Sequence, residues 1–205
     1  MVLTGVYYAI ACTAAGLVVA YLTRPWFGTP LFLFGLFCLW FFRDPERTAP
    51  QGPHAVSPAD GKVVAVKKET DVTRVSIFLS PLDVHVNRTP ISGTIIRAEY
   101  KPGKFLVASR EEASVENEQN IITVRGDDGS ELTFKQIAGL VARRVVLWKK
   151  AGDRVRMGER IGLMQFGSRM DILFSGEWEV VVRPGDRVWA ATTIIARLKA
   201  AKDSR

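Results

Sequence analysis

The chain has 205 residues, of which 47% are hydrophobic, with a formal net charge of +7 and a pI near 9.6. This length suits one domain, or one domain with an anchor. The charge suits an anionic partner, but the basic residues are scattered among acidic ones, which argues against a nucleic-acid interface. Both cysteines lie in the apolar first part and only two histidines are present. This composition argues against a disulfide framework, a thiolate metal site and a histidine-rich metal site.

Two uncharged apolar runs, residues 5–22 and 25–42, open the chain and are separated at Arg24. Each has nearly the length that a helix needs to cross a bilayer core, about 17–25 residues. We therefore expect a hydrophobic helical hairpin over residues 1–47 that associates with a membrane. No basic region precedes the first run, which argues against a cleaved signal peptide. Two alternatives remain, a re-entrant hairpin in one leaflet and a hairpin buried within a soluble protein.

The charges beside these runs predict an orientation. Arg43 and Arg47 follow the second run, whereas Arg24 alone separates the runs. By the positive-inside rule, the rest of the chain is expected on the cytoplasmic side of the cell membrane. Trp26 and Trp40 lie near the ends of the second run, as in an interfacial aromatic belt.

A β-rich domain is predicted over residues 48–205. It begins with a linker containing Pro and Gly at residues 48–53, and we interpret His54 as part of this linker. Residues 127–130 are interpreted as a hairpin turn, because Gly129 accepts a positive φ. Short runs rich in β-branched and aromatic residues, bounded by turn residues, are predicted as strands. They are residues 63–66, 74–79, 94–98, 121–125, 131–136, 143–148 and 177–183.

A short internal repeat indicates the type of β domain. Residues 150–155 (KAGDRV) return as residues 183–188 (RPGDRV). A Gly-Asp turn that leads into a strand twice predicts two related β-hairpin units, as in lipoyl/biotinyl-type β-sandwiches. A carrier of that type needs a lysine at the hairpin tip, but Gly167, Ser168 and Arg169 occupy the comparable place between two apolar runs. We therefore predict a mainly β fold, a compact antiparallel domain with lipoyl-like hairpin units, that does not carry lipoate or biotin.

Three residues are candidates for catalysis. Asp60 precedes Gly61 in a turn before a predicted strand, and His85 lies between apolar neighbours. Ser168 follows Gly167 between two apolar runs. Taken singly, each suits an ordinary structural role, as a turn residue or a buried histidine. A serine hydroxyl becomes a nucleophile when a base lies within reach, and a glycine beside it lets the attacking oxygen approach.

Five motifs, taken together and in order, resemble those of the phosphatidylserine decarboxylases, in particular a short branch with a single histidine. The resemblance covers most of the chain. It includes an Asn-Glu element in the polar stretch of residues 111–120, which we otherwise interpret mostly as a solvated loop. The motifs are FFRDPER (41–47), SPADGK (57–62), LSPLDVHVNR (79–88), ENEQN (116–120) and FGSRMD (166–171).

The resemblance implies a proenzyme that cleaves itself between Gly167 and Ser168. Ser168 would attack the Gly167 carbonyl, and elimination would separate residues 1–167 from residues 168–205. The second chain would then begin with a pyruvoyl cofactor, a pyruvate group derived from Ser168, which takes up the substrate's amine and acts as an electron sink. The implied activity converts phosphatidylserine in the membrane into phosphatidylethanolamine. The two chains of the precursor are the implied partners, and a homo-oligomer is allowed.

The resemblance also assigns roles to site residues. It implies that Asp60 serves self-processing and that His85 serves catalysis. Longer members of the family have a second histidine where this chain has Arg88, so their Asp-His-Ser relay does not carry over intact. Either Asp60 acts more directly, or His85 serves both steps, or the base lies elsewhere. Arg88 in contact with the substrate's phosphodiester or with a carboxylate is a further alternative.

Arg169 and Asp171 flank the expected pyruvoyl position. We expect the two charges to pair and fix the turn, with contact to the substrate's anionic groups as the alternative. Two other functions remain open for the whole chain. One is a decarboxylase of a related serine phospholipid, such as an archaetidylserine-like lipid, which shares the headgroup chemistry. The other is a non-enzymatic, membrane-anchored β-sandwich adaptor, which would stay uncut.

Overall fold

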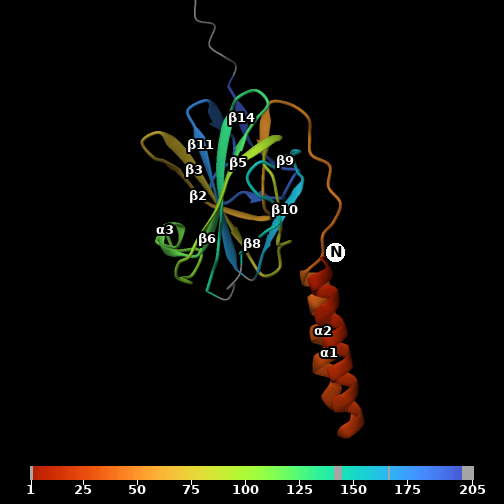
Figure 1. The fold of residues 1–205 in the computed structure, drawn as a ribbon. Helices are drawn as coiled ribbons and strands as arrows, with labels where there is room; N and C mark the ends of the chain where they lie inside the picture. The colour runs from red at the N-terminus through yellow and green to blue at the C-terminus, as the bar shows by residue number, and fades with distance from the viewer. Residues whose placement is uncertain (1, 141–144, 166, 200–205) are drawn as a thin grey trace, which may run out of the picture. The chain divides into compact units, whose positions relative to one another are not determined.

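The computed structural model describes residues 2–140, 145–165 and 167–199. The chain forms two compact units, Met1–Glu46 and Arg47–Arg205. The first contains a helical pair and the second a β domain (Figure 1). The predicted fold class, a mainly β antiparallel domain preceded by a hydrophobic helical hairpin, is therefore confirmed.

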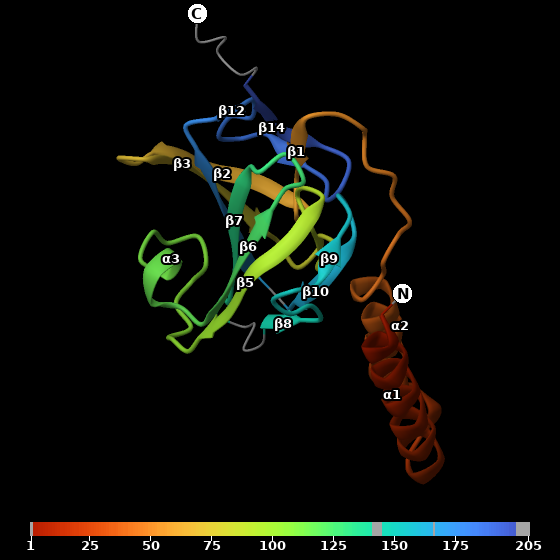
Figure 2. The ribbon, with the colours of Figure 1, turned by 45° about the horizontal axis from the view of Figure 1, so that its top comes forward.

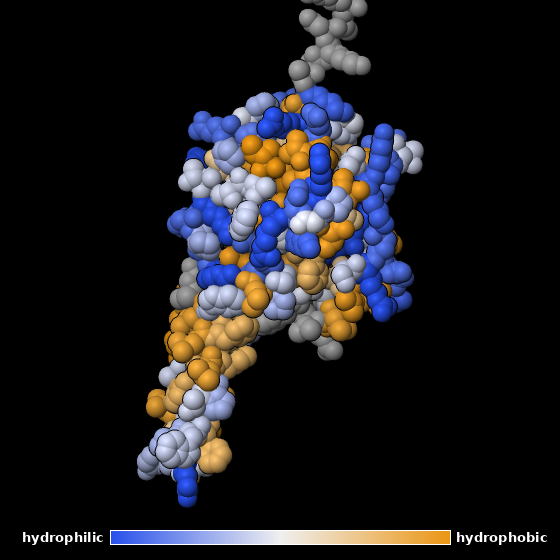
Figure 3. Space-filling view, turned by 180° about the vertical axis from the view of Figure 1, so that it is seen from behind, coloured by the Kyte–Doolittle hydropathy of each residue, from blue (hydrophilic) through white to orange (hydrophobic). Residues whose placement is uncertain are grey.

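The helical unit consists of α1 (Leu3–Leu22) and α2 (Pro25–Phe41). The helices pack closely: a Cβ on Gly28 would lie 2.5 Å from the carbonyl oxygen of Gly16. Figure 3 shows apolar side chains over much of this pair, whereas hydrophilic side chains dominate the surface of the β domain. By length and composition, α1 is able to cross a membrane, and α2 is a shorter apolar helix.

The β domain contains a large antiparallel sheet and two small ones (Figures 1 and 2). The large sheet has the order β13 (Arg187–Val188), β2 (Gly61–Lys68), β3 (Val72–Leu79), β11 (Ser168–Ser175), β7 (Glu131–Ile137), β6 (Gln119–Arg125), β5 (Gly93–Lys101) and β9 (Arg154–Val155). One small sheet has the order β1 (His54–Val56), β14 (Ile194–Leu198) and β12 (Trp178–Val180). The other has the order β4 (Val86–Arg88), β10 (Arg160–Met164) and β8 (Val145–Leu147). A short helix, α3 (Ala113–Glu116), precedes β6.

Alternation along β11 shows how the sheet separates two environments. Met170, Ile172 and Phe174 are fully buried and belong to the hydrophobic core. Arg169 and Asp171, which alternate with them, point to the other face because successive side chains of a strand lie on opposite sides. The Ser168 side chain therefore lies on the same face of β11 as these core residues.

The structure corrects the interpretation of His54 as a linker residue. His54 begins β1, is 8% exposed and pairs with Arg197 of β14. Its Nε2 lies 3.2 Å from the carbonyl oxygen of Pro50. The partner strand lies more than a hundred residues later, so no local pattern indicates this pairing.

The polar stretch of residues 111–120 is only partly a loop. It contains α3 and the first residues of β6. Asn117, Gln119 and Asn120 are buried there, so this part is a correction of the predicted solvated loop. Their amide groups make internal hydrogen bonds, which explains how polar side chains are accommodated.

The β domain consists of two halves with the same arrangement of strands. The large sheet reads β13-β2-β3-β11 from one edge and β9-β5-β6-β7 from the other, and each half adds one small sheet. The predicted Gly-Asp turns lead into β9 and β13. In both turns an Asp side chain accepts the backbone N–H three residues earlier, Lys150 to Asp153 at 2.9 Å and Arg183 to Asp186 at 2.8 Å. The predicted recurrence of a Gly-Asp turn before a strand is confirmed, and the repeat extends over the whole domain. The strands that follow the turns pair with the distant strands β5 and β2 and not within local hairpins.

The strand register makes two Gly-Ser peptide bonds equivalent. The pairing runs Arg187–Lys62–Phe78–Arg169 in one half and Arg154–Thr94–Arg125–Glu131 in the other. The residues just before these end points are Gly167-Ser168 and Gly129-Ser130, and both glycines have a positive φ, 70° and 85°. Gly129-Ser130 belongs to the turn between β6 and β7, as predicted.

Gly167-Ser168 has a different connection to its neighbours. The equivalent strands β3 and β11 are separated in the chain by residues 80–167, which contain the whole other half. The expectation that Gly167-Ser168 lies at a hairpin tip is corrected here, because β10 and β11 belong to different sheets. The chain enters β11 from the other half of the domain, and the candidate bond lies at this entry point.

Candidate active site

Ser168 is the first residue of β11, where it pairs with Leu79 at the end of β3. Its side chain is fully buried, and its Oγ has no hydrogen-bond partner among the residues that the structure describes. Buried hydroxyl groups nearly always have a partner, so an exception calls for a functional explanation. Gly167 before it has a φ of 70°, a conformation that glycine adopts without steric cost. The sequence thus places an unengaged nucleophile directly after a left-handed glycine.

The carbonyl group of Gly167 lies against the backbone of Gly139. A Cβ on Gly139 would lie 1.8 Å from the Gly167 carbonyl oxygen and 2.9 Å from its carbonyl carbon. Only a residue without a side chain permits this approach. Gly139 lies two residues after β7, in an apolar segment with no recognisable motif, so the sequence analysis missed it.

His85 is fully buried just before β4. Its Nδ1 lies 2.9 Å from the carbonyl oxygen of Asp83. A carbonyl oxygen only accepts, so Nδ1 carries the proton, and the neutral ring then has its basic lone pair on Nε2. The His85 carbonyl oxygen accepts the N–H of Met164 at 3.1 Å, which holds His85 beside the chain that leads to Gly167.

Asp60 lies just before β2 and is 5% exposed. Its two carboxylate oxygens accept hydrogen bonds from Arg47 at 2.5 and 2.8 Å, a bidentate ion pair. Its Oδ1 also accepts the backbone N–H of Ala190 at 2.8 Å. From the sequence, Arg47 is expected only as a charge that flanks the apolar run, and no local pattern indicates its pairing with Asp60.

The structure places Asp60 and Ser168 on either side of the same strand. Both lie beside the end of β3, Asp60 ahead of β2 and Ser168 at the start of β11. Two strand spacings separate β2 from β11, which corresponds to roughly 10 Å. In the described part of the chain, the Asp60 carboxylate contacts Arg47 and Ala190, so an effect on Ser168 would act over this distance.

Arg88 stands where longer family members have a second histidine. It is 4% exposed, and its Nη1 donates a hydrogen bond to the carbonyl oxygen of Gly158 at 3.0 Å. Its backbone N–H donates to Pro58, which leads into the Asp60 turn. Arg88 thus ties the second half of the domain to the segment that carries Asp60.

Arg169 and Asp171 pair with each other, as expected. Arg169 Nε donates to Asp171 Oδ1 at 2.6 Å, and its Nη2 donates to Ser76 at 2.8 Å. Asp171 Oδ2 accepts the hydroxyl of Ser114 at 2.5 Å. Both charges are fully buried on the face of β11 opposite to Ser168. They attach the segment around α3 to the sheet.

Further charges surround this buried pair and line a cavity of about 390 Å³. Burial opposes the ionisation of Glu111, but hydrogen bonds from Lys67 and Arg74 hold the pKa of its carboxyl group below the ordinary value. Burial also lowers the pKa of the Lys135 amine. This face of the sheet is thus closed by an ionic cluster.

Replacing Asp171 with asparagine is expected to destabilise the domain by about 3–5 kcal/mol, because the Arg169 charge would stay buried without its nearest counterion. The substitution keeps the side-chain shape and one acceptor for Ser114. Thermal unfolding in detergent should show Tm lowered by roughly 10 °C. The control is Glu131→Gln, in an exposed pair with Arg125, which should change stability by less than about 1 kcal/mol. Equal Tm values for the two variants would contradict the structural role of Asp171.

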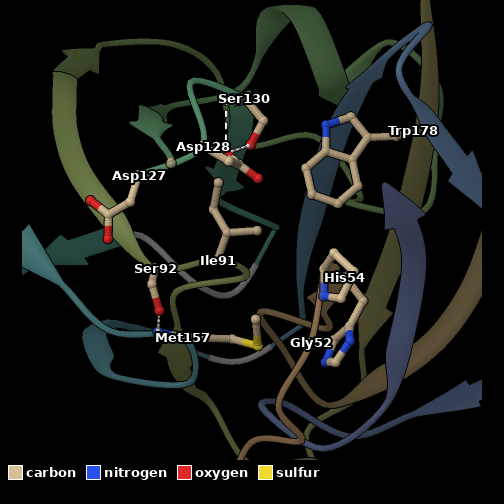
Figure 4. Close-up of a pocket in the computed structure, with 11 residues that line it drawn as sticks. Gly52, His54, Ile91, Ser92, Asp127, Asp128, Ser130, Met157 and Trp178 are labelled. Carbon is tan, nitrogen blue, oxygen red and sulfur yellow. Dashed lines mark hydrogen bonds between the residues drawn. The ribbon is translucent and has the colours of Figure 1, made fainter. Parts of the chain in front are cut away.

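The candidate active site around Ser168 has an equivalent in the other half of the domain, a cavity of about 230 Å³ (Figure 4). His54 lies in its wall, and Ser130 occupies the position that corresponds to Ser168. The Ser130 hydroxyl, however, donates to Asp128 at 2.6 Å, and this bond lowers the pKa of the Asp128 carboxyl group. The serine in this half is therefore already engaged.

The position of Asp60 has its own counterpart in this cavity. Ser92 Oγ accepts the N–H of Met157 at 2.8 Å, as Asp60 Oδ1 accepts that of Ala190 (Figure 4). The two halves thus share the same frame but differ in chemistry. A carboxylate and an unengaged hydroxyl occur together in one half, the one that contains Gly167-Ser168.

Comparison with known proteins identifies the family of the chain. The family model for phosphatidylserine decarboxylase matches residues 34–196. The phosphatidylserine decarboxylase proenzyme of Solibacter usitatus is 64% identical over 197 residues, which are 96% of each chain. The proenzyme of Saccharopolyspora erythraea is 44% identical over 190 residues, 86% of this chain and 80% of the relative. The chain therefore belongs to the phosphatidylserine decarboxylase family.

Proposed function

We propose that this chain decarboxylates phosphatidylserine to phosphatidylethanolamine after cleaving itself between Gly167 and Ser168. The observation that carries the proposal is the buried, unengaged hydroxyl of Ser168 beside the left-handed Gly167. Membership of a family whose curated members are named proenzymes supports a processing step. Processing would convert Ser168, at its buried position, into the reactive pyruvoyl group.

The proposed self-cleavage begins when Ser168 Oγ attacks the carbonyl carbon of Gly167. The hydroxyl proton goes to a base, the peptide C–N bond breaks, the nitrogen is protonated, and an ester replaces the amide. A base then removes the Ser168 α-proton, the Cβ–Oγ bond breaks, and Gly167 leaves as a carboxylate. Water replaces nitrogen in the remaining dehydroalanine, ammonia leaves, and a pyruvoyl group starts the second chain.

The residues around Ser168 fit a pyruvoyl group, because the position is buried, begins a strand and has no competing hydrogen bond from the residues that the structure describes. When present, this group supplies an electrophilic ketone that takes up the substrate's amine and accepts the electron pair released with CO₂. We assign proton transfer in this reaction to Nε2 of His85, the basic nitrogen of the neutral ring. Ser168 has no exposed surface in the uncut chain. Access for the headgroup therefore requires the residues before Ser168 to move after cleavage.

We propose that Asp60 serves the self-cleavage, with Arg47 and Ala190 fixing its carboxylate. Asp60→Asn keeps an acceptor for Ala190 but removes the negative charge. We expect cleavage to slow by about 10²–10⁴-fold, the range for the loss of an acid–base group. Ser92→Ala, at the equivalent position in the other half, is the control and should cleave normally. Electrophoresis over time would measure both rates, and wild-type cleavage of Asp60→Asn would remove Asp60 from the mechanism.

The two chains are proposed to stay together after cleavage. Residues 168–205 contain β11, which pairs with β3 and β7 on its two sides. They also contain β13 and β14, which pair with β2 and β1. Every one of these partner strands belongs to residues 1–167, so the sheets hold the chains without the peptide bond.

We further propose that residues 1–47 anchor the enzyme to the cell membrane, with the β domain on the cytoplasmic side. The length and apolar composition of α1 support the anchor. The arginines after α2 support the orientation by the positive-inside rule. A phospholipid substrate gives the anchor a purpose, because the headgroup to be decarboxylated lies at the membrane surface.

Intact mass measurement of the purified wild-type chain tests the proposal. We expect two chains, produced by cleavage between Gly167 and Ser168. The mass of the smaller chain should be lower by one NH₃ than that of the same peptide with an N-terminal serine. Incubation with phosphatidylserine should release CO₂, and a parallel assay with an ether-linked serine phospholipid would identify the lipid core. A folded chain that stays uncut would contradict the proposal and favour the adaptor function.

A further inference from the structure

Two Gly-Ser bonds occupy equivalent positions in the β domain, but only Gly167-Ser168 is proposed to break. We propose that Gly139 is the positioning residue that holds the Gly167 carbonyl for attack by Ser168, and that Asn117 fixes Gly139 in place. This inference rests on the proposed self-cleavage and specifies how it is directed to one bond.

The first observation is the contact between Gly139 and Gly167. The position of a Gly139 Cβ lies 1.8 Å from the Gly167 carbonyl oxygen, so the oxygen occupies the space that a side chain would fill. The Cβ of Ala108 lies 3.3 Å from the same point. The oxygen thus lies against the segment after β7, and the segment before α3 borders the same Gly139 position.

Asn117 connects the segments of Gly139 and Ala108. Its Nδ2 donates to the carbonyl oxygens of Leu106 at 2.9 Å and Ala138 at 2.7 Å, and its Oδ1 accepts the N–H of Leu106 at 2.9 Å. Leu106 lies two residues before Ala108, and Ala138 directly precedes Gly139. Asn117 is fully buried. One amide group therefore sets the spacing between the Gly139 segment, which contacts the carbonyl oxygen, and the Ala108 segment beside it.

Positioning matters here because the attack converts a planar carbonyl into a tetrahedral centre. The hydroxyl oxygen must approach the carbonyl carbon along a narrow path, and a misplacement of 1 Å costs about 10²-fold in rate. An alanine at position 139 would displace the oxygen by more than this. The place where a Gly167 side chain would project is open, so the scissile segment has room to yield without unfolding the domain.

The equivalent bond serves as an internal comparison. Of the described glycines, none approaches the Gly129 carbonyl oxygen as Gly139 approaches that of Gly167. The Ser130 hydroxyl is also held by Asp128, whereas the Ser168 hydroxyl is unengaged. The two bonds share the backbone conformation of their glycines, so this conformation alone does not select the bond.

The test is the rate of self-cleavage of full-length Gly139→Ala in detergent, followed by intact mass. We expect it to fall about 100-fold. Gly176→Ala is the matched control, because a Cβ there would meet nothing within 4 Å, and it should cleave at the wild-type rate. Hydroxylamine gives a second readout because it cleaves esters much faster than amides. Loss of carbonyl positioning blocks ester formation, so hydroxylamine should not release the small chain from Gly139→Ala.

Thermal unfolding separates positioning from a general loss of fold. In the uncut Ser168→Ala background, adding Gly139→Ala should lower Tm by only a few degrees. Asn117→Ser adds no atom beside Gly167 and should also slow cleavage without accumulating an ester. The proposal is overturned if Gly139→Ala cleaves at the wild-type rate or accumulates a hydroxylamine-sensitive ester. It is also overturned if Gly139→Ala unfolds in the Ser168→Ala background and Asn117→Ser cleaves normally. A wild-type chain that never cleaves would instead refute the proposed function itself.

Discussion

Replacing Ser168 with alanine is expected to leave a single chain of 22.7 kDa that has no decarboxylase activity. The substitution removes the nucleophile of the proposed cleavage and also the atoms from which the pyruvoyl group would form. Alanine fits the site, because Ser168 Oγ makes no hydrogen bond in the described part of the chain. Intact mass and release of CO₂ from phosphatidylserine would measure the two losses. The fold should persist, with an unchanged or slightly higher Tm.

Ser130→Ala is the matched control for this experiment. Ser130 follows a left-handed glycine at the equivalent position of the other half, and it is 6% exposed. This variant should cleave and decarboxylate like the wild type, although loss of the bond to Asp128 should cost about 1 kcal/mol of stability. Normal cleavage of Ser168→Ala would disprove the assigned bond. Loss of cleavage in both variants would show that the requirement for a serine hydroxyl is not specific to Ser168.

The part of the fold that sequence predicts is the part with local signals. Each predicted run overlaps a strand. Residues 143 and 144 of one run lie outside the described residues, and in the last predicted run, residues 177–183, the strand covers only Trp178–Val180. Runs of β-branched residues bounded by turns identify such strands because their side chains suit a pleated, half-buried surface. The short strands β1 and β9 have no such pattern. They exist because distant partners pair with them.

The candidate site shows the same limit. Ser168, His85 and Asp60 were identified because they belong to motifs that are visible in the chain. Arg47 was visible as a charge, but its pairing with Asp60 depends on how the linker folds back. Gly139 had no signal at all, because a glycine required by a close contact looks like any other glycine until the contact is known.

The internal repeat suggests why the candidate bond lies where it does. In one half, β6 and β7 are joined directly through Gly129-Ser130. In the half that contains β3 and β11, the chain enters β11 at the same place, after it has formed the half that contains β6 and β7. Cutting there leaves β3 and β11 paired along their full length. A break at this point therefore frees a new N-terminus beside the core at little cost to the sheet.

His85→Asn is expected to lower decarboxylation by about 10²–10⁴-fold while the domain stays folded. The asparagine amide can donate to the carbonyl of Asp83 in place of Nδ1 of the imidazole ring, so the local hydrogen bond is kept. What is lost is the basic nitrogen Nε2, to which we assign proton transfer. The rate should be measured on cleaved enzyme and normalised to its pyruvoyl content by mass, which separates decarboxylation from self-cleavage.

The second histidine of the chain provides the control for this variant. His54 is also buried, and its ring contacts a backbone carbonyl, that of Pro50. His54→Asn therefore carries a similar cost in packing but lies in β1, in the half-site of Figure 4. It should retain the wild-type rate. Full activity of His85→Asn would withdraw the catalytic role of His85. Slow cleavage together with slow decarboxylation would show that one imidazole serves both steps. A shared imidazole is what the arginine at position 88 requires if no other base lies near Ser168.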